Sequence, residues 1–385
     1  PATADAQIAV RGQTVHTMDG PSISDGIVLI RDGRIEAVGP ANRVRIPSGY
    51  QTLTAAVVTP GLIDAHSVVG LAGYMNQSGD QDQLEMSDPI QPELRAIDAY
   101  NARERLIEWV RGFGVTTLHT GHGPGALISG QTMIVRTSGD NLADVLVDSV
   151  TAVAMTLGES VGQRYGGKPG TRSKGVAMLR AELIKAQNYV AQQDSGKAKR
   201  DLGMETLARL LRGEIAGLIT AERANDIMTA IRLADEFGFR LILDGASEAP
   251  LVLDEIKAAG VPVILHATMV RPGGERISAS FETASKLAAA GIPFALQSGY
   301  EGYVPKTRVV LWEAGLAAAN GLSFNDALAS ITSSAAQIIG QSDRVGSLTV
   351  GKDADVVLFD GDPFEYTSHV CHVIARGVVV SDECR

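Results

Sequence analysis

Four segments in the middle of the chain share one pattern: a glycine, then an apolar run, then polar or small residues. They are GVTTLHTG (114–121), GFRLILDG (238–245), GVPVILHAT (260–268) and GIPFALQSG (291–299). The last three each follow an amphipathic segment long enough for a helix, at 223–237, 250–259 and 281–290. Apolar strands that alternate with helices are typical of a parallel sheet covered on both faces. The pattern favours a closed α/β barrel of the TIM type over an open doubly wound sheet.

The two ends of the chain differ from this middle part. Residues 7–57 alternate β-branched segments with Asp-Gly turns, and residues 346–382 again show a strand-and-turn pattern. We therefore expect one small sheet domain assembled from both termini. A length of 385 residues is enough for a large barrel with such a satellite domain.

Charge and composition limit which binding partners and which cellular compartment are expected. A formal net charge of -10 argues against nucleic acid or an anionic membrane surface, and no apolar run is long enough to span a bilayer. We expect a small-molecule substrate or ligand as the partner, and the sequence leaves open whether the protein forms a homo-oligomer. Cys371 and Cys384 are expected to be free thiols, although an oxidising compartment would allow a bridge. Because the sequence starts at Pro1 without methionine, a removed signal peptide is conceivable, and we favour export to the periplasm over the cytoplasm.

The segment PGLIDAHSVVG (60–70) ends an apolar run with His66. Residues i and i+2 of a strand point to the same side, so a metal-binding strand would carry a second histidine at position 68. Two imidazoles there could hold one divalent ion. Val68 occupies that position and offers no lone pair.

Several motifs together resemble the amidohydrolase superfamily, and specifically its imidazolonepropionase-like branch. They are IEAVGP (35–40), PGLIDAH (60–66), GVTT (114–117), AERANDIMTAIRLADEFGF (221–239) and DRVGSLTVGKDADVVLFDGDPF (343–364). The resemblance spans nearly the whole chain. It implies a distorted (β/α)8 barrel at 58–345 with a small β-sandwich domain formed by residues 1–57 and 346–385. It also implies hydrolysis of amide, lactam or related C–N bonds by water held on one or two divalent metals.

Most of the metal ligands that the resemblance implies are replaced. His66 matches the first histidine of the family's His-x-His pair. The other implied ligand positions fall on Val68, Thr220, Glu222, Asp244 or Gly245, and Gly299. A catalytic zinc needs about three protein ligands, so we expect the family's metal site to be degraded or rearranged, and we assign no metal ligands.

Other polar side chains near strand ends could rebuild a site. The candidate catalytic residues are His66, Glu222, Asp244 and His266. The candidate substrate-binding residues are His119, His122, Arg223 and Gln297. A set of two histidines and two carboxylates would suit a single Zn²⁺, and two carboxylates could do acid–base work without a metal if one raised the pKa of the other. Arg223 matches an arginine of the family motif and could bind a substrate carboxylate bidentately.

Structural alternatives exist for these residues. Asp244 could cap the next helix, and Glu222 could pair with Arg223 at a helix start. The histidines at 119 and 122 could be loop residues that face water. Three functions therefore stay open: a divergent amidohydrolase acting on small amides, lactams or peptide-like molecules, a non-catalytic ligand-binding barrel, or a conventional metal-dependent amidohydrolase whose ligands lie at other positions.

Overall fold

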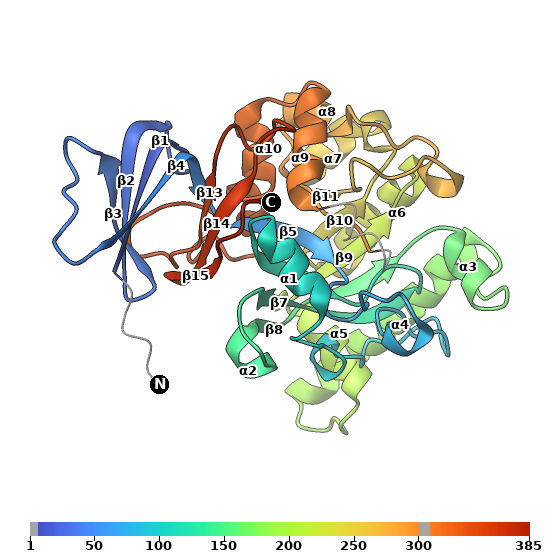
Figure 1. Ribbon diagram of the computed structural model, residues 1–385. Helices are drawn as coiled ribbons and strands as arrows, with labels where there is room; N and C mark the ends of the chain where they lie inside the picture. Colours follow the sequence, from blue (N-terminus) through green and yellow to red (C-terminus); the bar gives the residue numbers. More distant parts are fainter. Residues whose placement is uncertain (1–6, 301–308) are drawn as a thin grey trace.

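The computed structural model describes residues 7–300 and 309–385, which form two sheets (Figure 1). The seven-stranded sheet has the order β15-β14-β13-β4-β1-β2-β3. Its strands are β1 (Ile8–Val15), β2 (Ile23–Arg31), β3 (Arg34–Pro40), β4 (Gln51–Pro60), β13 (Val356–Phe359), β14 (Val370–Ala375) and β15 (Val378–Ser381). In Figure 1 the blue N-terminal strands and the red C-terminal strands lie side by side, with the red strands next to α1 of the barrel domain. The prediction of one small β domain built from both chain ends is confirmed.

The eight-stranded sheet has the order β12-β11-β10-β9-β8-β7-β6-β5. Its strands are β5 (Leu62–Ser67), β6 (Val115–Gly121), β7 (Ile128–Arg136), β8 (Leu146–Thr156), β9 (Ala216–Ala221), β10 (Leu241–Gly245), β11 (Val263–Leu265) and β12 (Phe294–Ala295). A parallel bridge between Ser67 and Gly299 brings the two edges together, so the sheet forms the distorted barrel that the sequence predicts.

The distortion lies at β7, which is antiparallel to both β6 and β8. The connections at 122–127 and 137–145 are too short for the helical crossover that parallel strands need, and the second holds only the short helix α2 (Leu142–Val145). The four-segment pattern of the sequence did not include β7 or β8.

Helices cover the outside of the barrel. The longer ones are α1 (Arg105–Gly112), α4 (Arg172–Asp194), α5 (Leu202–Leu211), α6 (Ala224–Phe237), α8 (Thr283–Ala290) and α9 (Val310–Ala319). Shorter helices are α3 (Ser160–Arg164), α7 (Leu253–Ala259), α10 (Phe324–Ser330), α11 (Ser333–Ile338), and the 3-10 turns Ser78–Asp80, Ala96–Asp98, Ala249–Leu251 and Gly274–Arg276. Three of the four glycines that open the apolar runs, Gly238, Gly260 and Gly291, cap the preceding helix in a left-handed conformation that glycine adopts readily; Gly238, for example, ends α6 with φ of 70°.

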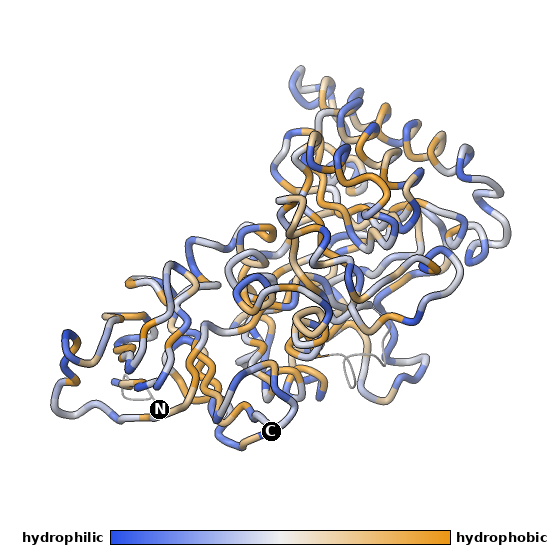
Figure 2. The backbone as a smooth tube through the Cα atoms, turned by 90° about the horizontal axis from the view of Figure 1, so that it is seen from above, coloured by the Kyte–Doolittle hydropathy of each residue, from blue (hydrophilic) through white to orange (hydrophobic). Residues whose placement is uncertain are grey.

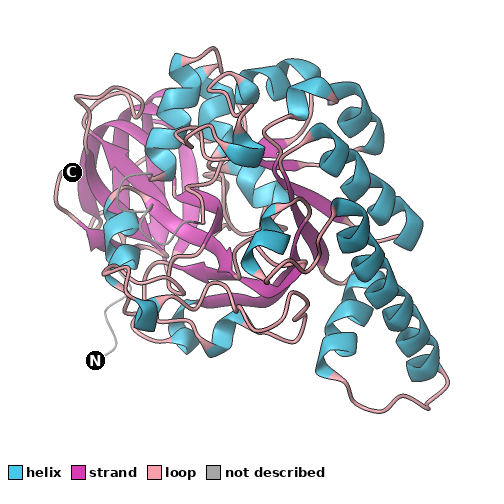
Figure 3. Cartoon of the chain, turned by 90° about the vertical axis from the view of Figure 1, so that its right-hand side faces the viewer, coloured by secondary structure: helices cyan, strands magenta, loops and turns pink. Residues whose placement is uncertain are grey.

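Apolar residues fill the barrel and the space beneath its helices. The barrel interior holds a cluster of small and branched side chains that includes Ala65, Ala152, Leu218, Ile242 and Ile264. Figure 2 shows hydrophobic and hydrophilic residues alternating along the helices, as expected for helices with one buried side. Figure 3 shows α4 and α5 as an antiparallel pair that extends from the body of the barrel. In the described part of the chain, no helix is long and apolar enough to cross a membrane.

One disulfide and one cluster of ion pairs link separate segments of the chain. Cys371 and Cys384 form a disulfide, so the expectation of free thiols is wrong: β14 and the C-terminal residues run close together and bring the two side chains into contact. The buried carboxylate of Asp353 binds Arg136 of β7 at 2.6 Å, Arg34 at 2.6 Å and Arg344 at 3.0 Å. Asp353 thereby joins the β domain to the barrel.

Candidate active site at the carboxyl ends of the barrel strands

A buried polar cluster lies where the parallel barrel strands end. Asp244 comes from β10, His66 from β5 and Thr220 from β9, and Gln297 follows β12. All four side chains are buried. In barrels of this type the carboxyl ends of the strands carry the active site.

Asp244 is the centre of this cluster. Its Oδ1 lies 2.9 Å from His66 Nδ1 and accepts a hydrogen bond from Gln297 Nε2 at 2.8 Å. Its Oδ2 accepts a hydrogen bond from the Thr220 hydroxyl at 2.6 Å. Thr220 and Asp244 are directly opposite each other in the β9–β10 pairing, which explains this contact. The carboxylate is therefore held by side chains from three other strands or strand ends.

His66 and Asp244 shift each other's charge state. Burial raises the pKa of Asp244, but the charge of His66 and the hydrogen bonds outweigh it and lower that pKa overall. Burial lowers the pKa of His66, but Asp244, with a smaller effect from Asp64, raises it overall. The two groups therefore favour an imidazolium–carboxylate pair. Nε2 of His66 is buried and has no hydrogen-bond partner.

Glu222, just after β9, is a second buried acid. Its Oε2 accepts hydrogen bonds from the Ser247 amide at 3.1 Å and the Ser247 hydroxyl at 2.5 Å, whereas Oε1 has no partner. Burial raises the pKa of Glu222 to about 7, against the opposing effect of the Ser247 hydrogen bonds. Gly245 gives the carboxylate its space: it has φ of 79°, and a Cβ there would lie 2.8 Å from Oε1.

The three other histidines predicted for the site are buried and differ in their contacts. His119 is fully engaged: Nδ1 donates to the Ala65 carbonyl at 2.8 Å, and Nε2 lies 2.8 Å from the Thr132 hydroxyl. His266 donates from Nδ1 to the Ala267 carbonyl at 2.8 Å, and its Nε2 has no partner. Neither nitrogen of His122 makes a hydrogen bond of good geometry, although the Gln83 backbone is near enough to raise its pKa against the effect of burial. Burial lowers the pKa of each of these histidines to about 4, so all three are neutral at pH 7.

Arg223 lies apart from this cluster. Its guanidinium donates to Glu248 Oε1 at 2.8 Å, and Glu248 also accepts the Ala224 amide at 2.9 Å. Arg223 therefore pairs with Glu248 and not with Glu222, and it does not line the cavity described next.

A cavity of about 230 Å³ lies over the strand ends. Its lining includes Thr220 and Glu222 from β9 and its following loop, Tyr300 after β12, Arg164 at the end of α3 and Arg276 at the end of the 3-10 turn Gly274–Arg276. Within the described residues the Arg164 guanidinium forms no ion pair. The ring of Tyr300 lies 6.0 Å from that of His66. His66 and Asp244 do not line the cavity but lie beneath it.

The long loops after β5 and β8 meet beside this cavity. The hydroxyl of Tyr165 donates to the Glu85 carbonyl at 2.7 Å, which joins the two loops. The Gly123 amide donates to the Gln83 carbonyl at 2.8 Å, so the first loop packs on the β6–β7 connection. These contacts place both loops at the barrel mouth.

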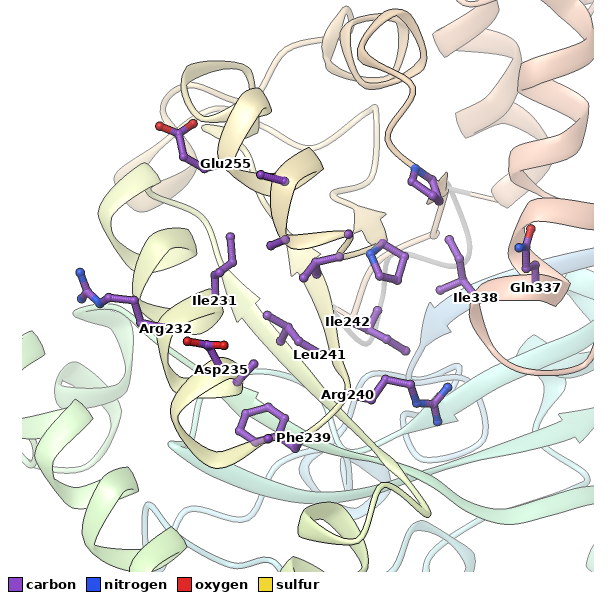
Figure 4. A pocket seen from close by; sticks show the side chains of 18 residues that line it. Ile231, Arg232, Asp235, Phe239, Arg240, Leu241, Ile242, Glu255, Gln337 and Ile338 are labelled. Atoms are coloured by element: carbon purple, nitrogen blue, oxygen red, sulfur yellow. The ribbon is translucent and has the colours of Figure 1, made fainter.

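A larger hollow of about 970 Å³ lies at the opposite end of the barrel strands (Figure 4). Its apolar lining includes Phe239, Leu241 and Ile338, and Figure 4 shows Arg232 and Glu255 pointing outward from it. None of the residues predicted for the active site lines this hollow. The candidate site is therefore the polar cluster at the other end.

Comparison with known proteins shows what this chain is similar to in sequence and in fold. The barrel, the β domain from both termini and the polar strand ends define an amidohydrolase-type fold. A model of the amidohydrolase family matches residues 265–381. The chain is 25% identical to an imidazolonepropionase of Porphyromonas gingivalis, over 95% of this chain and 91% of that protein. It is 26% identical to the amidohydrolase tasK of Hapsidospora irregularis, over 88% of this chain but only 38% of the length of tasK.

Solved structures agree. An amidohydrolase from Thermotoga maritima MSB8 superimposes with a TM-score of 0.91 at 29% identity, over 98% of this chain and 100% of that chain. A prolidase complexed with N-methylphosphonate-L-proline shares the fold, with a TM-score of 0.59 at 16% identity over 98% of this chain and 100% of that chain. In sequence and in fold this chain is similar to members of the amidohydrolase superfamily.

The side chains at the mouth do not fit the divalent ion that the resemblance implies. Asp244 already accepts three hydrogen bonds, and both nitrogens of His119 are engaged. The unpartnered atoms of His66, Glu222 and His266 do not form a ligand set: across residues 7–300 and 309–385, no group of three or more His, Cys, Asp or Glu side chains is placed to hold a metal ion.

Proposed function

We propose that this protein is a divergent amidohydrolase that hydrolyses C–N bonds in small amides, lactams or peptide-like molecules. The observation that supports this most is the pair of buried acid–base groups at the strand ends, His66 with Asp244 and, separately, Glu222. His66 Nε2 and Glu222 Oε1 are buried without a hydrogen-bond partner. Buried ionisable groups are costly for a fold, and their position at the carboxyl ends of barrel strands is the one that catalysis uses.

The roles follow from these contacts. In the molecules where His66 is neutral, its Nδ1 is held by Asp244 and its Nε2 accepts a proton from the attacking water. Glu222 lines the cavity, and with its pKa raised to about 7 by burial it carries a proton in a large fraction of molecules at neutral pH. It donates that proton to the leaving nitrogen. Arg164 binds an anionic group of the substrate. A cavity of about 230 Å³ suits a small molecule.

A non-catalytic ligand-binding barrel is the second candidate. It is favoured by one observation: His66 and Asp244 lie beneath the cavity, behind Thr220 and Tyr300, and do not line it. In such a protein the same cavity would bind a small molecule without cleaving it.

A hydrolysis screen separates these functions. Purified protein is incubated with N-acyl amino acids, dipeptides and lactams, once after dialysis against EDTA and once with added zinc, manganese or iron, and amine release is measured. We expect turnover of at least one compound, lost in Glu222→Gln and His66→Asn variants. Thermal stabilisation by a compound that is never cleaved would instead support the binding barrel. Turnover that appears only with added metal would support a conventional metal-dependent amidohydrolase.

We also propose export to an oxidising compartment, with the periplasm as the place. The Cys371–Cys384 disulfide supports this, because such bridges persist in oxidising compartments and are rare in the cytosol. Fractionation of cells followed by thiol labelling tests it: the protein should be found outside the cytoplasm with both cysteines blocked. Homo-oligomer formation stays a proposal that light scattering of the purified protein would test.

A further inference from the structure

We propose that Thr220 and Gln297 are positioning residues that hold His66 and Asp244 as a proton-transfer pair, which takes over the work of a metal-bound water. The inference rests on the proposed hydrolysis and goes beyond it, because it assigns two further residues and a metal-independent mechanism. The polar cluster around Asp244 carries it.

The geometry fixes Asp244 from both sides. Thr220 donates to Oδ2 at 2.6 Å and Gln297 donates to Oδ1 at 2.8 Å. With both oxygens held, the carboxylate cannot rotate away from His66, whose Nδ1 lies 2.9 Å from Oδ1. Nε2 is then the only nitrogen of that imidazole without a partner. This is the arrangement in which a buried carboxylate orients an imidazole for proton transfer.

The same contacts explain why a cation is not needed to fix these groups. Thr220 stands at a position where the resemblance implies a metal-binding histidine, and here it donates a hydrogen bond to the carboxylate. The positive partner of Asp244 is the imidazolium form of His66, whose pKa Asp244 raises against the effect of burial. Asp64, His119 and Tyr300 are other titratable neighbours of His66, and Glu222 is a neighbour of Asp244.

A purely structural role for the network explains less. Buried polar networks that only stabilise a fold satisfy all their members, whereas this one leaves His66 Nε2 and Gln297 Oε1 without partners. Thr220 also lines the cavity while its hydroxyl donates to Asp244. The network therefore connects the cavity to the imidazole.

The proton balance of the step is as follows. In the molecules where His66 is neutral, water oxygen bonds to the carbonyl carbon, the water proton passes to Nε2, and the carbonyl π pair moves to oxygen. When that pair returns, the C–N bond breaks and the leaving nitrogen takes the proton of Glu222. His66 then loses its extra proton and Glu222 regains one through solvent, so one amide and one water give one carboxylic acid and one amine.

Two substitutions of Thr220 separate positioning from packing. Thr220→Ser keeps the hydroxyl and loses a methyl group, whereas Thr220→Val keeps the shape and loses the hydroxyl. With a substrate found in the screen, we expect Ser to keep kcat within about twofold and Val to lower it about tenfold or more with KM little changed, the size expected for one hydrogen bond to a charged group. If Thr220→Val has a higher kcat than Thr220→Ser, Thr220 acts through packing and the proposal is wrong.

Thr120→Val is the matched control. Thr120 is buried on β6 and its hydroxyl donates to the Val69 carbonyl at 2.8 Å, so its loss also removes a buried hydrogen bond. We expect a loss of stability similar to that of Thr220→Val but an unchanged kcat. An equal loss of kcat in both variants would overturn the assignment.

Metal independence has its own measurements. Chelation should leave kcat unchanged, metal analysis should find no stoichiometric ion, and Asp244→Asn should lower kcat by about 10²–10⁴-fold. Nitrogen NMR of labelled histidine, which needs no turnover and is recorded at a pH where His66 is neutral, should show a proton on His66 Nδ1 in wild type and Thr220→Ser, and exchange between both nitrogens in Thr220→Val. Turnover abolished by chelation overturns this inference but leaves the proposed hydrolysis intact. No turnover under any condition overturns the proposed hydrolysis itself.

Discussion

Glu222 makes folding stability depend on pH in a way that one substitution reveals. Glu222→Gln is nearly isosteric: the amide oxygen can keep both hydrogen bonds from Ser247, and the amide nitrogen takes the place of the unpartnered Oε1. The substitution removes one titrating group and little else.

The magnitude follows from the pKa. Burial raises the pKa of Glu222 from its ordinary value of 4.5 to about 7. The folded protein therefore holds this proton at pH values where the unfolded chain has released it. The stabilisation is fully present below pH 4.5 and is lost as pH rises to about 7. At about 1.4 kcal/mol per pKa unit, the loss amounts to about 3 kcal/mol.

Urea unfolding of wild type and Glu222→Gln at several pH values between 4.5 and 8 measures this. We expect the free energy of unfolding of the variant, relative to wild type, to rise by about 3 kcal/mol across that range. Other buried carboxyls such as Asp64 titrate in both proteins and cancel in the difference. Glu108→Gln, on the exposed side of α1, is the control for replacing a carboxylate by an amide away from the site. A difference between wild type and Glu222→Gln that does not change with pH would refute the assignment of a raised pKa.

Three further predictions concern the free energy of unfolding. Gly245→Ala should lower it by about 1–2 kcal/mol because alanine is strained in a left-handed backbone, and by roughly a further 1–3 kcal/mol because the new methyl group meets the Glu222 carboxylate. Gly238→Ala is the control: a Cβ there has nothing within 4 Å, so only the backbone contribution is expected, and equal losses for both variants in urea unfolding would contradict the contact. Cys371→Ser should lower the free energy of unfolding by about 3 kcal/mol, because the bridge to Cys384 closes a loop of 13 residues in sequence; an unchanged unfolding midpoint in reducing agent would contradict the bridge. Asp353→Asn should cost about 3 kcal/mol or more, since it leaves a buried arginine without its partner, and a loss below about 1 kcal/mol, the range of a surface pair, would show that the pair contributes little.

The barrel could be predicted where its strands are locally apolar and not elsewhere. The glycine-initiated runs at 238–245 and 260–268 contain β10 and β11 because a strand covered on both faces needs apolar residues throughout. β7 is equally buried but carries Gln131 and Thr132. Gln131 is satisfied by the Pro92 carbonyl and the Thr206 hydroxyl, partners far away in sequence. Because β7 carries polar residues, its sequence does not show the apolar run that is typical of a buried strand.

The candidate site was predictable as a set of residues but not as a set of contacts. Polar residues at strand ends pointed to His66 and Asp244, and the structure joins them. The role of Thr220 depends on the register of β9 against β10, and a sequence pattern does not give that register. Arg223 was predicted from the family motif to bind a substrate carboxylate, with its sequence neighbour Glu222 as the alternative partner, yet it binds Glu248, 25 positions further on. In each case the missing information is which distant segments meet.

The β domain built from both termini has a consequence for synthesis on the ribosome. Strands β1 to β4 emerge first and can pair among themselves, but one side of β4 has β13 as its partner, which is translated about 300 residues later. At a typical elongation rate of about 5–20 residues per second, that edge waits for roughly 15 seconds to a minute. An unpaired edge strand is a site of aggregation. A nascent chain stalled within the barrel would therefore expose the unpaired edge of β4, which is prone to aggregate. A chaperone that shields this edge during the interval should raise the yield of folded protein.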